Sequence, residues 1–345
     1  MSATIFSHLL LPYLIAMFLA INMGGSGTAP SFSTAYGTNL IKKGLIPGLF
    51  GIMVFIGAIA AGKNTSLTIG NDLLPREMMD YTLVSIILLS VSLALLFANI
   101  MGIPQSTSQA TILSVTAPAL YFNTLNTNKL FVDILPTWFI LPIISFVICF
   151  LIGKYIYNPI RKRGLLFKAK THNHPILKGL IISMSLYVAF SIGANNVANA
   201  AGPIASMTIN ELDMHPTEHN FKLIMILSTL IVAPNFGIGS SFFGRKIMQN
   251  TGKEIILFGK IEAIIIAFVT ASLLLMASVI KGVPTSLVQL NVGAILGIGV
   301  AKLGAKNIFR KTEVNKFFVI WLISPLISFF TALILTWLAD TNGLL

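Results

Sequence analysis

Charged residues are scarce in this sequence. Only 10% of the 345 residues are Asp, Glu, Lys or Arg, whereas 55% are hydrophobic. Soluble globular domains carry charge on about a quarter of their residues. The composition therefore excludes an ordinary soluble protein and predicts an integral membrane protein. Cysteine is scarcer still, because the single Cys149 excludes an internal disulfide.

The sequence also lacks the polar–apolar alternation of a membrane β-barrel. Its apolar residues instead form long runs that could cross a bilayer as helices. We therefore predict an all-α, polytopic fold of about 10–12 transmembrane helices. The predicted spans lie at about 5–23, 32–61, 81–102, 107–122, 134–157, 176–193, 197–239, 255–281, 284–301 and 317–339. The run at 107–122 is short, and its length fits either a span or a re-entrant segment.

The net charge of +12 is unevenly distributed along the chain. The stretch from Lys154 to Lys178 holds seven basic residues and no acid, which the positive-inside rule places in the cytoplasm. Alternation of spans outward from it puts most other basic residues on the same side and most acids opposite. The charge therefore indicates topology, and no nucleic-acid partner is predicted. We expect a multi-pass protein of the plasma (cell inner) membrane, surrounded by lipid.

An internal repeat is visible. Gly24–Pro30 corresponds to Gly193–Asn199, and Gly102–Ser106 corresponds to Gly282–Ser286. We predict a first transmembrane repeat at 1–158, a basic cytoplasmic linker at 159–175 and a second repeat at 176–345. An odd number of spans in each repeat gives the two halves opposite orientations. Inverted repeats with polar interruptions at matching positions are typical of secondary transporters.

Two kinds of polar interruption recur in the repeats. Small polar residues occupy 24–31 and 193–203, and a Gly-hydrophobic-Pro sequence opens 102–109 and 282–289. Proline beside Ser or Thr predicts a helix start, and a helix start inside the membrane presents free N–H groups that favour an anion. We therefore predict broken helices or re-entrant hairpins that converge on one anion at the midplane. The predicted anion-binding residues are Ser26, Gly27, Thr28, Ser106, Thr107, Ser108, Asn195, Asn196, Asn199, Thr285 and Ser286.

Four residues are candidates for the coupling ion. Glu262 lies near the start of a predicted span and Asp80 is its counterpart in the first half. A carboxylate at membrane depth is a functional hypothesis by default, although both could be paired or solvated at the interface. Gln109 and Gln289 end the Gly-hydrophobic-Pro segments. The five histidines fall at the terminus or in predicted loops, and we predict neither a metal site nor a cofactor.

The motifs resemble those of a known family. Gly193-Ala-Asn-Asn-Val-Ala-Asn-Ala resembles the GANDVANA signature of the inorganic phosphate transporters (PiT family), and Pro104-Gln-Ser-Thr-Ser-Gln109 resembles that family's P-x-S-T-T-H. The resemblance covers nearly the whole chain and implies symport of an inorganic oxyanion at a site between two inverted repeats. The sequence departs from the family at its signature Asp, which is Asn196 here and Gly27 in the first half. The family's His is replaced by Gln109 and Gln289.

The CysP-type sulfate permease branch of this superfamily is more similar. It shares the patterns Ala20–Gly27, Ala98–Pro104 and Gly297–Lys302, and the resemblance implies sulfate uptake, driven by protons rather than sodium. Physical chemistry agrees. Phosphate keeps a proton near neutral pH and gains from an acceptor such as a carboxylate, whereas sulfate requires only donors. Losing carboxylates also removes hard oxygen ligands for sodium.

The predicted function is secondary active transport of a tetrahedral oxyanion, with proton-coupled sulfate uptake as the first choice. A phosphate symporter coupled to sodium or protons is the alternative, and an anion channel is the alternative from another class. An enzyme is not predicted, because the sequence holds neither HExxH nor GxSxG. A homodimer is a possible assembly.

Overall fold

The computed structural model describes residues 2–101, 105–162, 174–215, 217–251, 259–310 and 312–345. Within these ranges the chain forms helices and no β-strand, which confirms the predicted all-α fold. Seven of the described helices are long and apolar enough to cross a membrane, and two shorter apolar helices, Leu287–Leu303 and Pro325–Thr341, accompany them. The protein is therefore a polytopic helical membrane protein.

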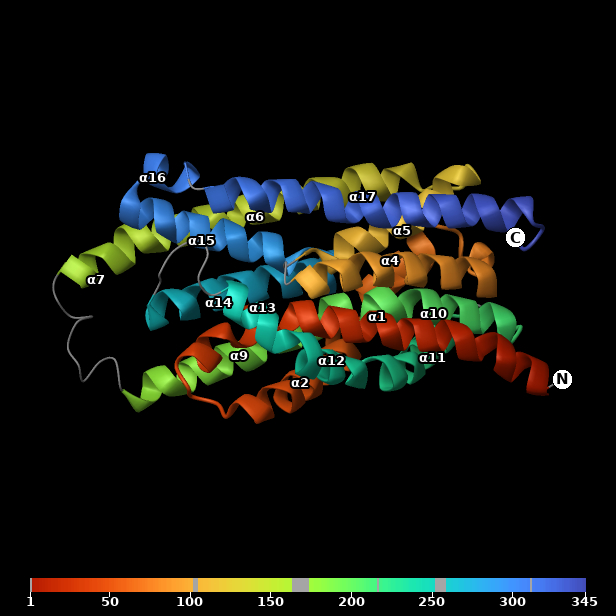
Figure 1. Ribbon diagram of the computed structural model, residues 1–345, viewed down its shortest axis with the longest axis horizontal. Helices are drawn as coiled ribbons and strands as arrows, with labels where there is room; N and C mark the ends of the chain where they lie inside the picture. The colour runs from red at the N-terminus through yellow and green to blue at the C-terminus, as the bar shows by residue number, and fades with distance from the viewer. Residues whose placement is uncertain (1, 102–104, 163–173, 216, 252–258, 311) are drawn as a thin grey trace.

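The helices of the first half pass between two opposite ends of the molecule. Helix α1 starts at the end where both termini lie and reaches the opposite end, and α6 runs in the same direction (Figure 1). The chain next to α6 continues in π-helical turns at Lys129–Ile134 and Ile152–Tyr157. The half comprises α1 (Ser2–Gly37), α2 (Ile46–Ala61), α3 (Lys63–Leu67), α4 (Tyr81–Met101), α5 (Thr107–Tyr121), α6 (Leu135–Leu151) and α7 (Asn158–Lys162).

The first helix of the second half starts at the opposite end of the molecule from the start of α1 (Figure 1). Helix α9 begins at the end of the molecule where α1 finishes, and α17 ends beside the C-terminus (Figure 1). This half comprises α9 (Pro175–Asn196), α10 (Ala198–Glu211), α11 (Glu218–Val232), α12 (Pro234–Gly239), α13 (Arg245–Thr251), α14 (Lys260–Met276), α15 (Leu287–Leu303), α16 (Ala305–Phe309) and α17 (Thr312–Thr341). Most of the predicted linker, 163–173, lies outside the described residues.

Each half contains a helical hairpin that enters from one end and returns to it. Helices α4 and α5 occupy the end near the termini, whereas α14 and α15 occupy the opposite end (Figure 1). The tip of each hairpin lies near the middle of the molecule. The apolar run at 107–122 is therefore a returning arm, because α5 ends where Tyr121 donates a hydrogen bond to Asp340 at the end of α17 (2.7 Å).

The predicted helix break at 24–31 is wrong, because α1 is continuous through this segment. Its hydroxyl groups donate to carbonyls of the preceding turn, as Thr28 does to Gly24 (2.7 Å) and Ser31 does to Gly27 (3.0 Å). Such local bonds satisfy the polar groups at membrane depth without a break in the helix. The matching segment in the second half is interrupted only at Val197, a single residue between α9 and α10.

Two helix crossings depend on glycine, and they correspond between the halves. A Cβ atom at Gly24 would lie 2.2 Å from the carbonyl oxygen of Phe236 on α12, and one at Gly193 would lie 2.0 Å from that of Val54 on α2. Gly24 and Gly193 are equivalent in the predicted repeat. Helices α1 and α12 therefore cross at backbone contact, as α9 and α2 do. Small residues allow this close approach in membrane helices.

Each hairpin packs against the last long helix of the other half. Ser145 of α6 donates to the carbonyl of Leu290 on α15 (2.8 Å), and Ser328 of α17 donates to that of Ala110 on α5 (3.0 Å). The two bonds join equivalent positions of the predicted repeat. This exchange of hairpins makes each half depend on the other for its packing, and the division into two repeats stays a prediction.

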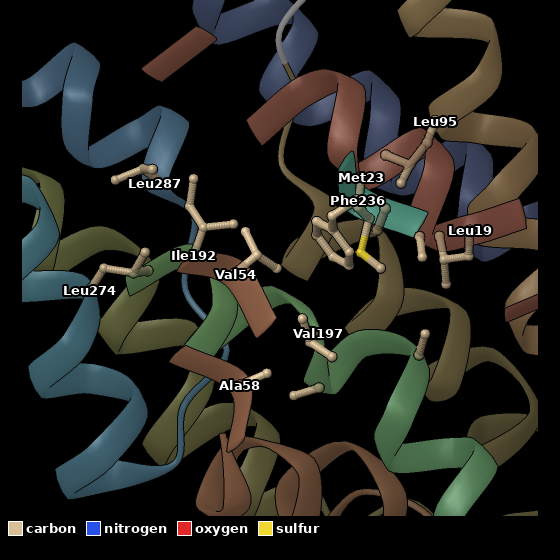
Figure 2. Packing of buried hydrophobic residues seen from close by; sticks show 14 of the residues in the cluster. Leu19, Met23, Val54, Ala58, Leu95, Ile192, Val197, Phe236, Leu274 and Leu287 are labelled. Atoms are coloured by element: carbon tan, nitrogen blue, oxygen red, sulfur yellow. The ribbon is translucent and has the colours of Figure 1, made fainter. Parts of the chain in front are cut away.

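A continuous apolar core surrounds the hairpin tips. Side chains from α1, α2, α9, α12 and α15 converge in it, with Met23, Val54, Ile192, Phe236 and Leu287 among them (Figure 2). Burial of these side chains alone specifies no unique arrangement in lipid, because lipid tails are also apolar. The glycine contacts and buried hydrogen bonds therefore select this packing.

The crossing of α2 and α9 gives a test of this packing. We expect Gly193→Ala to destabilise the fold by about 1–3 kcal/mol, because its methyl group would overlap the backbone of α2. Thermal unfolding in detergent measures the loss. Gly179→Ala on the same helix is the matched control, since nothing lies within 4 Å of its Cβ position. The control should be neutral or more stable, and equal melting temperatures for the two variants would contradict the packing argument.

Candidate anion-binding site

A small cavity lies where the two hairpin tips meet α1 and α9. It encloses about 270 Å³ of space outside protein atoms, part of it open to solvent. Its lining is uncharged and combines equivalent positions of the two halves, such as Gly27 with Asn196 and Ser106 with Ser286. The lining residues are Ser26, Gly27, Pro30, Gln105, Ser106, Thr107, Ile192, Asn196, Ser286, Leu287 and Val288.

Two helices begin at this cavity. Ser106 caps α5 by accepting from the N–H of Gln109 (3.2 Å), and Ser286 caps α15 by accepting from the N–H of Gln289 (3.3 Å). The cap dihedral angles φ and ψ also match, at −84° and 105° for Ser106 and −88° and 108° for Ser286. The helix starts predicted within 102–109 and 282–289 are present at Ser106 and Ser286, while Gly102–Pro104 lies outside the described residues.

These helix starts supply hydrogen-bond donors. The first backbone N–H groups of an α-helix have no partner within the helix, and Thr107, Leu287 and Val288 of the first turns line the cavity. The Ser106 and Ser286 oxygens accept from the backbone, so their hydroxyl protons remain available. Two helix dipoles also direct their positive ends toward the same space. The arrangement can bind an anion without a charged side chain.

Asn195 organises one wall of the site. Its Oδ1 accepts from the N–H of Thr285 (3.0 Å), and its Nδ2 donates to the carbonyl oxygen of the same residue (2.9 Å). Ser278 also donates to its Oδ1 (3.1 Å), and Ser108 Oγ lies 2.9 Å from its Nδ2. Asn195 thus ties α9 to the non-helical segment that precedes α15. It lies behind the cavity wall rather than in it.

The pairing of Asn195 determines which atom Asn196 presents to the cavity. A backbone N–H can only donate, so Thr285 fixes the orientation of the Asn195 amide. Its Nδ2 then donates to Oδ1 of Asn196 (2.7 Å). The Asn196 Oδ1 is therefore occupied, and its Nδ2 makes no hydrogen bond within the described residues. Asn196 lines the cavity and is 6% exposed, so its amide N–H group is a candidate donor for an anion there.

The structure separates the predicted anion-binding residues into three groups. Six line the cavity: Ser26, Gly27, Ser106, Thr107, Asn196 and Ser286. Asn195, Ser108 and Thr285 form the supporting network behind it. Thr28 instead bonds its own helix and packs against Gly244, while the Asn199 amide faces the Met23 sulfur at 3.7 Å.

None of the four coupling-ion candidates lines the cavity. Gln109 and Gln289 lie one turn inside α5 and α15 and bond each other. Glu262 is 2% exposed and pairs with Lys302 (2.7 Å), at the end of the molecule remote from the termini. Asp80 caps α4 by accepting from the N–H of Leu83 (2.7 Å). Burial raises the pKa of the Asp80 carboxyl above its ordinary value, although the hydrogen bonds that it accepts from the backbone of Leu83 and Thr82 act to lower that pKa.

Five lining residues were absent from the predicted set: Pro30, Gln105, Ile192, Leu287 and Val288. Pro30, Gln105, Leu287 and Val288 lie inside segments that the sequence singles out, so extension of the prediction to whole segments finds them. Ile192 lies outside those segments and carries no polar signal. Only the tertiary packing of α9 brings it to the cavity.

Comparisons with known proteins agree with this architecture. The phosphate transporter family matches residues 23–332. The sulfate permease CysP of Bacillus subtilis is 31% identical over 91% of this chain and 83% of its own length. A putative phosphate permease of Thermococcus kodakarensis is 25% identical over 92% of this chain and 94% of its own length. A solved structure described as the sodium-dependent phosphate transporter has the same fold, with a TM-score of 0.78 at 22% identity, covering 97% of this chain and 99% of that one.

Neighbouring asparagines should differ in their effect on stability. We expect Asn195→Ala to destabilise the protein by about 1–3 kcal/mol, because Thr285 and Ser278 lose buried partners. Asn196→Ala should cost less than about 0.5 kcal/mol, because it removes one acceptor and leaves the Thr285 pair intact. Chemical or thermal unfolding of the purified variants measures both. If Asn196→Ala were the more destabilising change, the assigned orientation of the two amides would be wrong.

Proposed function

The chain belongs to the phosphate transporter family, and we propose that it carries an inorganic tetrahedral oxyanion across the membrane as a secondary active transporter. Sulfate is the proposed substrate, and protons are the proposed coupling ions. The anion binds between the starts of α5 and α15, beside Asn196. The two hairpins then expose this site alternately to either side of the membrane.

The observation that carries the choice of sulfate is the polarity of the cavity. Asn196 presents a donor, and the serine hydroxyls and helix starts add further donors. Among the described lining residues none is a carboxylate, so none of them offers a negative charge to accept a proton from the anion. Sulfate is fully ionised at neutral pH and accepts hydrogen bonds only. Phosphate carries at least one proton there and would leave it without a charged acceptor.

The names of the relatives give further support. The relative with 31% identity is named a sulfate permease, and those at 25% are named putative phosphate permeases. Phosphate remains the second candidate substrate for this reason. The matching family is one of transporters, which supports transport rather than enzymatic catalysis.

Proton coupling is proposed from the same lining. Sodium requires several hard oxygen ligands, usually with a carboxylate among them, and the cavity offers amides and hydroxyls. The carboxylates of the described chain lie elsewhere, as Glu262 and Asp80 do at the bases of the two hairpins. We propose that Glu262, held by Lys302, and Asp80 are the groups that titrate during the cycle.

The proposed orientation places the end with residues 38–45 and the linker 159–175 in the cytoplasm. Lys42, Lys43, Lys302 and Lys306 lie in segments at this end, whereas Asp72, Glu77, Asp213 and Glu218 lie in segments at the other (Figure 1). This distribution follows the positive-inside rule. The protein is proposed to act in the plasma membrane, taking up the anion from outside.

Uptake by proteoliposomes tests the proposed function. We expect saturable uptake of labelled sulfate that an inward proton gradient accelerates, that a protonophore abolishes, and that excess phosphate inhibits weakly. An imposed sodium gradient should have no effect. Sodium-driven phosphate uptake without sulfate uptake would replace the proposed substrate and coupling ion. Non-saturable flux that ignores both gradients would indicate an anion channel.

Asn196→Asp tests the basis of selectivity. The new carboxylate can still accept from Asn195, so the fold should persist, but it puts a negative charge and an acceptor beside the anion. We expect sulfate uptake to fall by more than about tenfold and the preference for phosphate over sulfate to rise. Asn196→Ala is the control, since it removes the donor without adding charge. It should weaken sulfate uptake without favouring phosphate, and an identical substrate preference in both variants would refute the donor-only explanation.

A further inference from the structure

Gln109 and Gln289 occupy positions at which glutamine normally closes a capping box. In the pattern Ser-x-x-Gln, the glutamine side chain folds back and accepts from the backbone N–H of the cap serine. Both hairpins carry this pattern, at 106–109 and 286–289. Local sequence alone therefore predicts two separate, self-contained helix caps.

The structure shows a different pairing. Nε2 of Gln109 donates to Oε1 of Gln289 (3.1 Å), and Nε2 of Gln289 donates to Oε1 of Gln109 (3.0 Å). The residues are only 6% and 7% exposed. Two reciprocal bonds between equivalent residues join the first turns of α5 and α15 directly.

This pairing has a consequence for the cap serines. Each glutamine oxygen accepts across the interface, so the backbone N–H groups of Ser106 and Ser286 donate no bond to it. Neither N–H makes another hydrogen bond within the described residues, and both serines line the cavity. The cross-pair therefore leaves two donors for a ligand that ordinary capping boxes would occupy.

A second consequence is geometric. The two helix starts belong to hairpins that enter from opposite ends of the molecule (Figure 1). Within the described residues, the two reciprocal amide bonds connect these hairpins at the first turns of α5 and α15. The pair thus limits the separation of the donor groups that surround the cavity.

We propose that Gln109 and Gln289 form an amide clasp, a pair of positioning residues that hold the two helix starts at the spacing of one tetrahedral oxyanion and keep the Ser106 and Ser286 N–H groups free for it. The inference rests on the proposed function of the cavity. It assigns the pair a role other than proton coupling, because a carboxamide does not titrate in the physiological pH range.

A double-mutant cycle tests the clasp. The variants are Gln109→Leu, Gln289→Leu and the double variant, and the readout is the sulfate concentration that half-saturates the stabilisation of purified protein against thermal unfolding. Each single variant should bind sulfate about tenfold more weakly, because loss of either glutamine breaks the pair that holds the two helix starts at the spacing of the anion. The double variant should also be about tenfold weaker. Independent contributions would multiply to about a hundredfold and would overturn the proposal.

Ser145→Ala is the matched control. It removes a buried bond to α15 at Leu290, next to Gln289 but directed toward α6. Loss of packing alone would lower the melting temperature in this variant as in the glutamine variants, but sulfate affinity should stay at the wild-type value. Wild-type affinity in both Gln→Leu single variants would show that the pair is only structural.

A glutamate variant provides a test that does not depend on apolar replacements. Protonated Gln109→Glu can make the same two bonds to Gln289, so sulfate affinity should approach the wild-type value at low pH and fall more than about tenfold as the carboxyl ionises. A carboxylate also repels sulfate directly, so Gln109→Glu is repeated with Gln289→Leu. Acid should restore that double variant only to the affinity of Gln289→Leu. Restoration to the wild-type affinity would attribute the effect to charge and overturn the clasp.

Anion binding to the wild-type protein distinguishes a failure of the amide clasp from a failure of the proposed function. If it binds sulfate and the glutamine variants bind it equally well, the clasp is refuted and the transport proposal stands. If it binds inorganic phosphate instead, the same cycle with phosphate decides the clasp. If it binds neither anion, the proposed function of the cavity and the clasp both fail.

Discussion

The amide of Asn195 pairs with both backbone groups of Thr285, and the centre of the molecule depends on this interaction. The segment 282–286 is non-helical in the middle of a membrane protein, where an unpaired N–H or carbonyl costs several kcal/mol. Asn195 supplies the missing partners from α9. The same bonds orient Asn196 and bring the start of α15 to the cavity. The buried Asn195 amide thus satisfies the backbone of Thr285 and also bonds the Asn196 side chain that lines the cavity.

The two halves use the same contacts for packing but differ where the cavity forms. The crossings at Gly24 and Gly193 and the bonds of Ser145 and Ser328 are equivalent. The residues two and three positions further along α1 and α9 are not equivalent in type. Ser26 and Gly27 are small, whereas their counterparts, Asn195 and Asn196, are asparagines that form a hydrogen-bond network. The halves are thus similar in their packing contacts and different in the side chains that line the cavity.

The described residues that line the cavity are uncharged. Lys302 with Glu262, and Lys129 with Asp72 and Asp133, pair in segments toward the two ends of the molecule. The cavity relies on backbone dipoles and neutral donors, which act strongly in a low-dielectric region and do not change with pH. In the proposed transport cycle, an anion held in this way is not bound to a fixed countercharge, so its release requires movement of the hairpins. Glu262 and Asp80 are the groups proposed to control that movement.

Composition and pattern were enough to predict an all-α membrane protein, a repeat in which Gly24 matches Gly193, and helix starts at Ser106 and Ser286, because hydrophobicity, glycine and capping residues act locally. The continuity of α1 was missed, since hydroxyl groups that bond their own helix look the same in sequence as those that face a ligand. Ile192 reaches the cavity only through the tertiary packing of α9. The sequence by itself determined which residue types surround the centre. Only the tertiary structure decided which atoms they present, because the Asn195 amide that bonds Asn196 is oriented by a partner 90 residues away, and Gln109 pairs with a residue 180 positions away.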